Sequence, residues 1–177
     1  MHIDFKKIDS VQLKLNFRAA QPHDGLALWH LVRETGVLDL NSPYFYVLMA
    51  TDFGSTCLVV EHDQQIVGAI IGYHPPAQQD TVFCWQIAVH PTMQGQRLGQ
   101  KMLEHWLALP ANQSCLWLTA TVATDNAPSH KLFTRFAANN DAPCEWVPHF
   151  EANQFPDGHA AEPLVRIGPI VYSGGTV

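Results

Sequence analysis

Two glycines lie where a strand-like segment gives way to a helix-like one. Residues 81–90 are mostly apolar, as in a strand, and Gly95 and Gly99 follow at the start of a helical pattern. Each glycine in a helix costs about 1 kcal/mol relative to alanine, so the pair needs an offsetting role. The first turn of a helix has free backbone N–H groups and the positive end of the dipole, and glycine lets a ligand approach that backbone. The chemistry that this turn predicts is phosphate binding.

The turn itself, residues 94–99, matches neither of the common nucleotide-binding fingerprints. It has no Gly-Lys-Ser/Thr, as a Walker A loop would, and no Rossmann spacing of glycines. A second motif, Asp125-Asn126-x-x-Ser129-x-x-x-Phe133, predicts a helix with Asp125 or Asn126 as its cap. That structural role alone would explain Asp125 and Asn126, so neither motif identifies a function by itself.

Taken together, the strand, the turn, the helix and the DNxxSxxLF motif resemble the GCN5-related N-acetyltransferase superfamily. The resemblance implies an α/β (α+β) fold of the acyl-CoA N-acyltransferase type, in which helices cover both faces of a mixed central sheet. It also implies acetyl-CoA as co-substrate and no metal, and it places the pyrophosphate on the N–H groups of the turn. The coenzyme-binding residues that it implies are Ile87, Ala88, Val89, Gln94, Gly95, Gln96, Arg97, Leu98, Gly99, Asn126, Ser129 and Phe133.

Two residues depart from the superfamily pattern. Arg97 occupies the position of the family's middle glycine, so its side chain must either contact phosphate or point away from the ligand. Phe133 lies near the place where many members have a tyrosine that protonates the leaving thiolate. A phenyl ring donates no proton, so that role must lie elsewhere or be unnecessary.

Four segments carry a narrower likeness, namely LDLNSPYFY (38–46), FCWQIAVHP (83–91), TVATDNAPSHKLF (121–133) and RIGPI (166–170). Together they resemble the family of L-2,4-diaminobutyrate acetyltransferases. This resemblance implies direct attack of the 4-amino group on acetyl-CoA, giving N4-acetyl-L-2,4-diaminobutyrate, the precursor of the osmolyte ectoine. Two alternatives stay open, namely an acetyltransferase for another diamine or amino acid, and a non-catalytic acyl-CoA sensor that keeps the turn without an amine pocket.

An acceptor with two amines and one carboxylate needs an acid for its non-reacting ammonium and a cation or N–H donors for its carboxylate. Asp39, between the two early helices, is the first acidic candidate, and Asn41 in the same loop is a further candidate for binding the substrate. Glu162, before the last strand, is the second acid. A helix-flanking cap and a solvated loop residue are the simpler interpretations of Asp39 and Glu162. Arg33 and Arg166 are the candidates for the carboxylate.

Trp85 and Tyr44 are the candidates for catalytic roles. Period-two alternation along the strand predicts that Trp85 shares a face with Ile87, where it would wall the amine pocket or fill the core. Tyr44 and Tyr46 lie one helical step from Asp39, where either would line the pocket or donate a proton. The oxyanion donors would be backbone N–H groups exposed where the strand splays from its neighbour.

Direct attack is favoured because the sequence shows no activated nucleophile. Cys84 alternates to the face opposite Trp85 and has no base nearby in sequence, so we interpret it as a packing residue. The histidines show no spacing typical of a metal site. His149 and His159 lie in the late loop, where either could relay a proton or simply be exposed.

The elements that must position these residues follow from periodicity and turn signals. Residues 1–12 are polar and predict a flexible arm without the apolar core of a signal peptide, ahead of a single domain over 13–172. The helix at 96–108 joins two strands, so it predicts a βαβ crossover with the ligand at the carboxyl end of strand 81–90. Strands are expected at 13–20, 56–76 (two), 81–90, 114–123, 144–150 and 163–171, and helices at 21–36, 38–54, 96–108 and 126–139.

The bulk properties exclude several classes of partner. The chain has 177 residues, a formal net charge of -6 and no basic run, so nucleic acid and anionic membranes are poor partners. The four cysteines are widely spaced, which is typical of reduced residues in a cytoplasmic protein. The habit of the superfamily implies a homodimer.

Overall fold

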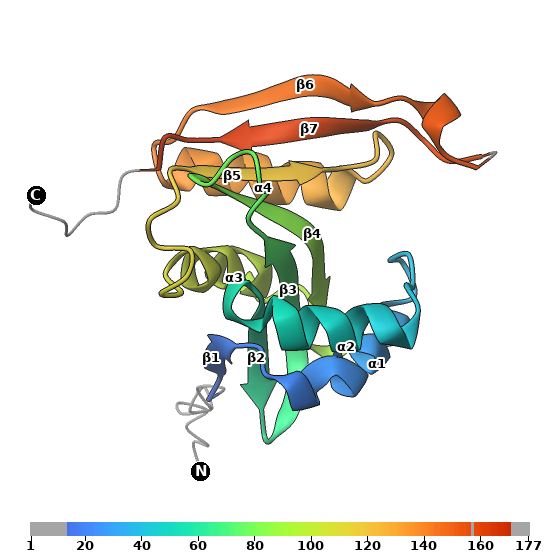
Figure 1. Cartoon of the computed structure of the whole chain (residues 1–177), viewed down its shortest axis with the longest axis vertical. Coiled ribbons are helices and arrows are strands. Elements are labelled where there is room, and N and C mark those ends of the chain that lie inside the picture. Colours follow the sequence, from blue (N-terminus) through green and yellow to red (C-terminus); the bar gives the residue numbers. More distant parts are fainter. Residues whose placement is uncertain (1–13, 157, 171–177) are drawn as a thin grey trace, which may run out of the picture.

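The computed structural model describes residues 14–156 and 158–170 (Figure 1). The arm expected at 1–12 lies outside these residues, and so do both ends of the domain expected over 13–172. The order of helices and strands is the one that the sequence predicts, from β1 through to β7.

A mixed sheet of seven strands organises the described residues, in the order β1-β2-β3-β4-β5-β7-β6 (Figure 1). Neighbouring strands are antiparallel except β4 and β5, which are parallel. Parallel neighbours need a crossover connection, and helix α3 (Leu98–Leu107) supplies it, which confirms the predicted βαβ unit. The strands are β1 (Asn16–Ala19), β2 (Leu58–His62), β3 (Gln65–Tyr73), β4 (Thr81–Val89), β5 (Trp117–Thr121), β6 (Cys144–Phe150) and β7 (Glu162–Ile167).

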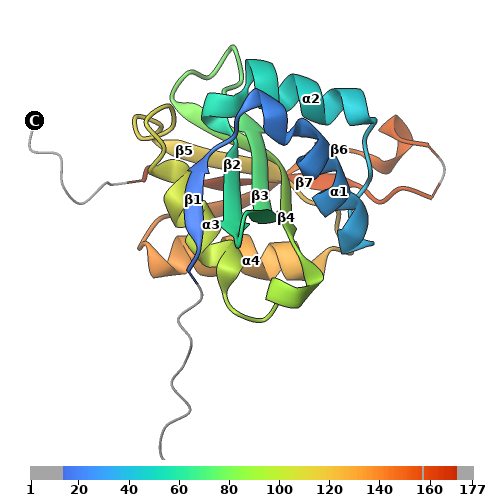
Figure 2. The same ribbon diagram turned by 90° about the horizontal axis from the view of Figure 1, so that it is seen from below.

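Helices cover both faces of the sheet, as expected (Figure 2). Helices α1 (Gly25–Thr35) and α2 (Pro43–Asp52) bury Leu28, Leu31 and Tyr46 against one face. On the other face, α3 (Leu98–Leu107) and α4 (Ala127–Asn139) bury Trp106 and Phe136. The two core clusters therefore sandwich the sheet and hold its strand ends in place. Short 3₁₀ turns lie at η1 (Pro22–Asp24), η2 (Gly54–Thr56), η3 (Pro91–Met93) and η4 (Ala152–Gln154).

Local sequence signals set the ends of the helices. The Ser42 hydroxyl accepts a hydrogen bond from the Phe45 N–H at 3.4 Å and caps α2. The Asn126 side chain accepts from the Ser129 N–H at 3.1 Å, so Asn126 and not Asp125 caps α4. Gly36 ends α1 at a φ of 67°, a conformation that glycine adopts without strain.

Strand β4 opens away from β5 halfway along its length. Its pairing with β5 covers residues 81–84 only, and β4 then continues to Val89 beside β3 alone. The register between β3 and β4 also shifts at this point, because Ile71 pairs with Gln86 while Gly72 pairs with Cys84. Trp85 is thus the extra residue of a β-bulge.

The bulge overturns the expected placement of Trp85. A bulge interrupts the period of two, so side chains on either side of it change faces. The Trp85 ring lies 5.6 Å from the ring of Phe45 on α2, whereas Ile87 packs against the core cluster under α3 and α4. The prediction that Trp85 and Ile87 share a face is therefore wrong.

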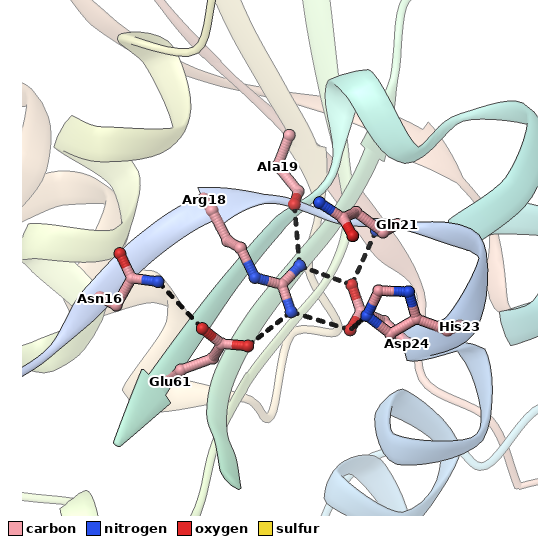
Figure 3. Close-up of polar contacts among 7 residues, drawn as sticks. All are labelled: Asn16, Arg18, Ala19, Gln21, His23, Asp24 and Glu61. Carbon is pink, nitrogen blue, oxygen red and sulfur yellow. Dashed lines mark hydrogen bonds and ion pairs between the residues drawn. The ribbon is translucent and has the colours of Figure 1, made fainter. Parts of the chain in front are cut away.

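A cluster of charged side chains fastens β1 to β2 and to the start of α1 (Figure 3). The Arg18 guanidinium lies 2.7 and 2.9 Å from the two oxygens of Asp24 and 2.6 Å from Glu61. Burial would raise the pKa of Asp24, but hydrogen bonds from Arg18 and from the Gln21 N–H outweigh it and hold that pKa below its usual value. The hydrogen bonds from Arg18 and Asn16 lower the pKa of Glu61 in the same way.

Candidate active site

The turn before α3 presents unpaired N–H groups to solvent. Gly95 has a φ of 78° and Arg97 a φ of 59°, so two residues of this turn are left-handed. Within the described residues, the N–H groups of residues 95–100 have no hydrogen-bond acceptor, and the first N–H of α3 that has one is that of Lys101, which donates to the Arg97 carbonyl oxygen. Such a nest of N–H groups at a helix N-terminus binds anions. α3 begins at Leu98, two residues later than expected, because of the left-handed Arg97.

The other residues of the turn have structural contacts of their own. The side chains of Gln94 and Gln96 donate back to the carbonyl oxygens of Val89 and Thr92, at 3.4 and 3.5 Å. A Cβ on Gly99 would lie 3.2 Å from a Leu132 methyl group on α4, so this glycine lets α3 and α4 approach each other. Close helix packing is a second reason for Gly99, beside the phosphate contact that the sequence predicts.

Some of the remaining residues expected to bind the coenzyme lie on the half of β4 that does not pair with β5, and others lie in the core. Ile87 and Val89 lie on the splayed half of β4 and pack against the α3 cluster, and Ala88 is buried under α1. Asn126 has one side-chain oxygen committed to capping α4, where Ser129 is half-buried. Phe133, at 2% exposure, is a core residue, as is Leu98. The splayed half of β4 runs into the open turn.

The two acidic candidates converge on one histidine. His159 Nε2 lies 4.0 Å from a carboxylate oxygen of Asp39 and 3.6 Å from one of Glu162. The His159 ring stacks on Phe155 at 4.0 Å, and its Nδ1 lies 2.7 Å from the Ala160 carbonyl oxygen. A carbonyl only accepts, so Nδ1 carries a proton and Nε2 faces the carboxylates. Two carboxylates so placed suit a cationic ammonium group.

The aromatic candidates differ in how far they are exposed to solvent. Tyr44 is 73% exposed at the start of α2, and Trp85 is 48% exposed against Phe45, so both are open to a ligand. Tyr46 is fully buried, which rules out the expected contact between its ring and an acceptor. Its hydroxyl instead accepts a hydrogen bond from the Asn41 N–H at 3.3 Å, so it fixes the loop that carries Asp39.

Several candidates lie away from this cluster. The Arg33 guanidinium packs over the Trp29 ring and that of Arg166 over the Trp117 ring, at 4.5 and 3.5 Å from the centroids. Burial raises the pKa of the Cys84 thiol to about 12, which fits its interpretation as a packing residue. Within the described residues, no group of three or more His, Cys, Asp or Glu side chains is arranged to hold a metal ion, and no helix is long and apolar enough to cross a membrane.

A polar side chain that no sequence motif indicated connects β4 to the acceptor loop. Gln86 is 9% exposed, donates to the Asp39 carbonyl oxygen at 2.6 Å and accepts from the Tyr46 hydroxyl at 3.2 Å. The available signal was a glutamine inside an otherwise apolar strand, since such a group needs buried partners.

The open turn, the splayed strand and the sandwiched mixed sheet define an acyl-CoA N-acyltransferase. Residues 26–138, more than half of the chain, match the model of the acetyltransferase (GNAT) family. The chain belongs to the GNAT acetyltransferase family. Ard1 from Thermoplasma volcanium shares this fold at 16% identity, with a TM-score of 0.69 over 89% of this chain and 99% of that one.

More similar relatives narrow the family further. The L-2,4-diaminobutyric acid acetyltransferases of Oceanobacillus iheyensis and Nocardia farcinica are 43% and 40% identical to this chain, over 87% and 86% of it and 88% and 79% of their own lengths. The structure of diaminobutyrate acetyltransferase EctA from Paenibacillus lautus, in complex with L-2,4-diaminobutyric acid and coenzyme A, superposes with a TM-score of 0.85. The two sequences are 35% identical, and the superposition covers 92% of this chain and 99% of the EctA chain. Within the GNAT family, the chain belongs to the diaminobutyric acid acetyltransferases.

Proposed function

We propose that this protein transfers the acetyl group of acetyl-CoA directly to the 4-amino group of L-2,4-diaminobutyrate, giving N4-acetyl-L-2,4-diaminobutyrate for ectoine biosynthesis. The observation that carries the proposal is the meeting of Glu162 and Asp39 at His159, with the loop of Asp39 attached to β4 by Gln86. The names of the relatives, and the substrate and coenzyme A in the EctA structure, support it independently.

The turn and the splayed strand are the proposed coenzyme site. The N–H groups of residues 95–97 and of the first turn of α3 bind the pyrophosphate, and Asn126 and Ser129 reach the coenzyme from the start of α4. The thioester would lie along Ile87, Ala88 and Val89, where β4 has no partner on the β5 side. Backbone N–H groups there are in position to stabilise the oxyanion, which is commonly the largest catalytic contribution.

The acceptor site is proposed to use charge for orientation. Asp39 and Glu162 hold the 2-ammonium group, while Trp85 and Tyr44 wall the side that faces the thioester and Asn41 supports the loop. Holding one amine by charge directs the other amine toward the acetyl group, because the two amines are separated by a fixed number of bonds. Tyr44 is the proposed proton donor for the leaving thiolate, since Phe133 has no proton to give, and the proton that the 4-amino group loses as the amide forms returns to Tyr44 through solvent.

An amine panel tests the proposed reaction. Purified protein and acetyl-CoA are incubated with diaminobutyrate, ornithine, lysine, 1,3-diaminopropane or putrescine, and released coenzyme A is measured. The simple diamines keep both amines but lack the carboxylate of diaminobutyrate. We expect kcat/KM for diaminobutyrate to exceed that for these diamines by at least about tenfold, the value of one charge-assisted contact to the carboxylate. A preference for another amine would favour a different acceptor, and binding of acetyl-CoA without turnover of any amine would favour the sensor.

The cellular setting is part of the same proposal. We infer that the protein acts in the cytoplasm during osmotic stress, where the reducing conditions suit a protein whose buried Cys57 and Cys84 form no disulfide. We also infer a homodimer, supported by the exposed Val147 and Phe150 on the edge strand β6. The molar mass from light scattering decides the dimer, because a monomer would give half of the expected value.

A further inference from the structure

The loop that carries Asp39 has few attachments of its own. Residues 37–42 form neither helix nor strand, and Val37 and Leu40 are 82% and 44% exposed. Among the described residues, the backbone of 37–41 makes two hydrogen bonds to the rest of the protein. The Asp39 carbonyl oxygen accepts from Gln86 Nε2 at 2.6 Å, and the Asn41 N–H donates to the Tyr46 hydroxyl at 3.3 Å.

These two hydrogen bonds belong to one buried chain of hydrogen bonds, which runs from Asn41 through Tyr46 and Gln86 to Asp39. The Tyr46 hydroxyl donates to Gln86 Oε1 at 3.2 Å, and Tyr46 and Gln86 are 0% and 9% exposed. A backbone carbonyl only accepts, so the NH₂ group of Gln86 must face Asp39 and its oxygen must face Tyr46. Every group in the chain thereby has a partner. Buried polar chains of this kind specify one arrangement, because a missing member leaves the others unsatisfied.

The bulge at Trp85 places Gln86 for this purpose. Gln86 follows the bulge directly and pairs with Ile71 of β3, so its backbone is held by the sheet. Its side chain points to α2, where Tyr46 lies. The strand on which the thioester is proposed to lie is thus connected, through one side chain, to the loop that presents the acidic group to the acceptor.

We propose that Gln86 and Tyr46 are positioning residues that hold residues 39–41 against β4 and so set the distance between the acceptor's ammonium site and the acetyl group. The identity of the acceptor rests on the proposed function, whereas the attachment of the loop does not. Neither side chain touches the acceptor. They act through the backbone of Asp39 and Asn41.

Three variants test this role by kinetics. Gln86→Met keeps the length of the side chain but removes its hydrogen bonds, and Tyr46→Phe removes only the bridging hydroxyl. Tyr73→Phe is the matched control, because Tyr73 packs against Phe83 and takes no part in these hydrogen bonds. We expect the first two to raise KM for diaminobutyrate about five- to twentyfold while KM for acetyl-CoA stays within about twofold. The double variant should be much less than additive, because both changes break one chain. Equal effects on both KM values, or an unchanged amine KM, would overturn the proposal.

Amide hydrogen exchange of the protein without substrate gives a second readout. Exchange at Asn41 should become at least about threefold faster in Tyr46→Phe and Gln86→Met, with no change in the core strands and none in Tyr73→Phe. Unchanged exchange at Asn41 contradicts the positioning role even if the kinetics differ. If the unaltered protein acetylates no diaminobutyrate, the proposed function fails, and the exchange measurement still decides whether Gln86 and Tyr46 hold the loop.

Discussion

Asp39 combines a carboxylate that is 96% exposed with a backbone that is held by Gln86. An exposed carboxylate contributes little to folding, so its value lies in what it meets from solution. Its neighbours Glu162 and His159 come from the far end of the chain, which brings a second negative charge to the same place. At the scale of single residues, this pair of carboxylates is the basis of our proposal that the site binds an ammonium group.

Replacing Asp39 by asparagine keeps the shape and removes the charge. A charge-assisted contact is worth on the order of 1.5–3 kcal/mol, so Asp39→Asn should lower kcat/KM for diaminobutyrate roughly ten- to a hundredfold. KM for acetyl-CoA should hardly change, because the phosphate turn lies elsewhere. Steady-state kinetics for both substrates measure this, with Asp52→Asn, at the exposed end of α2, as the matched control. Unchanged acceptor kinetics would remove Asp39 from the site and leave Glu162 as the acid.

Arg97 is a left-handed residue with a side chain at a position where the superfamily has glycine. A left-handed conformation strains a non-glycine residue by about 1–2 kcal/mol. The side chain is exposed and forms no cap for α3. We therefore expect Arg97→Gly to keep acetyl-CoA affinity within about twofold, or tighten it slightly, and to maintain or raise Tm. Titration of acetyl-CoA at two salt concentrations checks this. Weaker binding with a smaller salt dependence would show that Arg97 contacts a phosphate.

At the scale of elements, the phosphate turn offers a test that changes charge alone. A Cβ on Gly95 meets nothing within 4 Å, and aspartate and asparagine both tolerate its φ of 78°. Gly95→Asp should raise KM for acetyl-CoA about tenfold relative to Gly95→Asn, because a carboxylate would oppose the pyrophosphate. The ratio should shrink at 0.5 M salt, since exposed charges are screened. Equal KM values for the two variants would mean that no phosphate binds at this turn.

The Arg18 cluster that joins β1, β2 and η1 predicts a pH-dependent stability. Arg18→Met leaves Asp24, whose side chain is 3% exposed, without its cation. At pH 7 Arg18→Met should lower the free energy of unfolding by on the order of 3 kcal/mol. This is the low end for breaking a buried ion pair, because Arg18 itself keeps 21% of its side-chain surface in water. Arg135→Met, on the exposed face of α4, is the matched control.

The sign of the pH effect follows from the lowered pKa values. Asp24 and Glu61 have folded-state pKa values below their ordinary 3.8 and 4.5, so their stabilisation is present above those values and lost as pH falls through the folded ones. The difference in unfolding free energy between the unaltered protein and Arg18→Met should shrink as the pH is lowered from 5 toward 3. Urea denaturation at several pH values measures it. If this difference in unfolding free energy did not change with pH, the ion pairs of the Arg18 cluster would not be what stabilises the fold.

At the scale of the whole molecule, the sequence carried most of the architecture. Every helix and strand was predicted in order, because caps such as Ser42 and Asn126 and breakers such as Gly36 act over a few residues. The crossover through α3 followed from handedness and spacing. What local signals could not give was the bulge at Trp85, since a bulge is a property of two paired strands and its register is set by the partner.

In the candidate site, too, features that are local in sequence could be predicted and those that depend on distant contacts could not. The turn over 94–99 was predictable because its glycines and its helix are contiguous in sequence. The meeting of Asp39, His159 and Glu162 was not, because it depends on the approach of the loop between β6 and β7 to the loop between α1 and α2, which are far apart in sequence. The burial of Tyr46 was also missed, since α2 is apolar on most sides and its sequence gives no clear inward face.

The position of the acetyl group on the product tests the central claim most directly. The protein is incubated with acetyl-CoA and L-2,4-diaminobutyrate, and heteronuclear NMR assigns the acetylated nitrogen from correlations between the acetyl carbonyl carbon and the protons on C2 or C4. If Asp39 and Glu162 hold the 2-ammonium group, the product is N4-acetyl-L-2,4-diaminobutyrate, and Asp39→Asn gives a detectable share of the 2-acetyl isomer. A 2-acetyl product from the unaltered protein, or no acetylated product, would contradict the account.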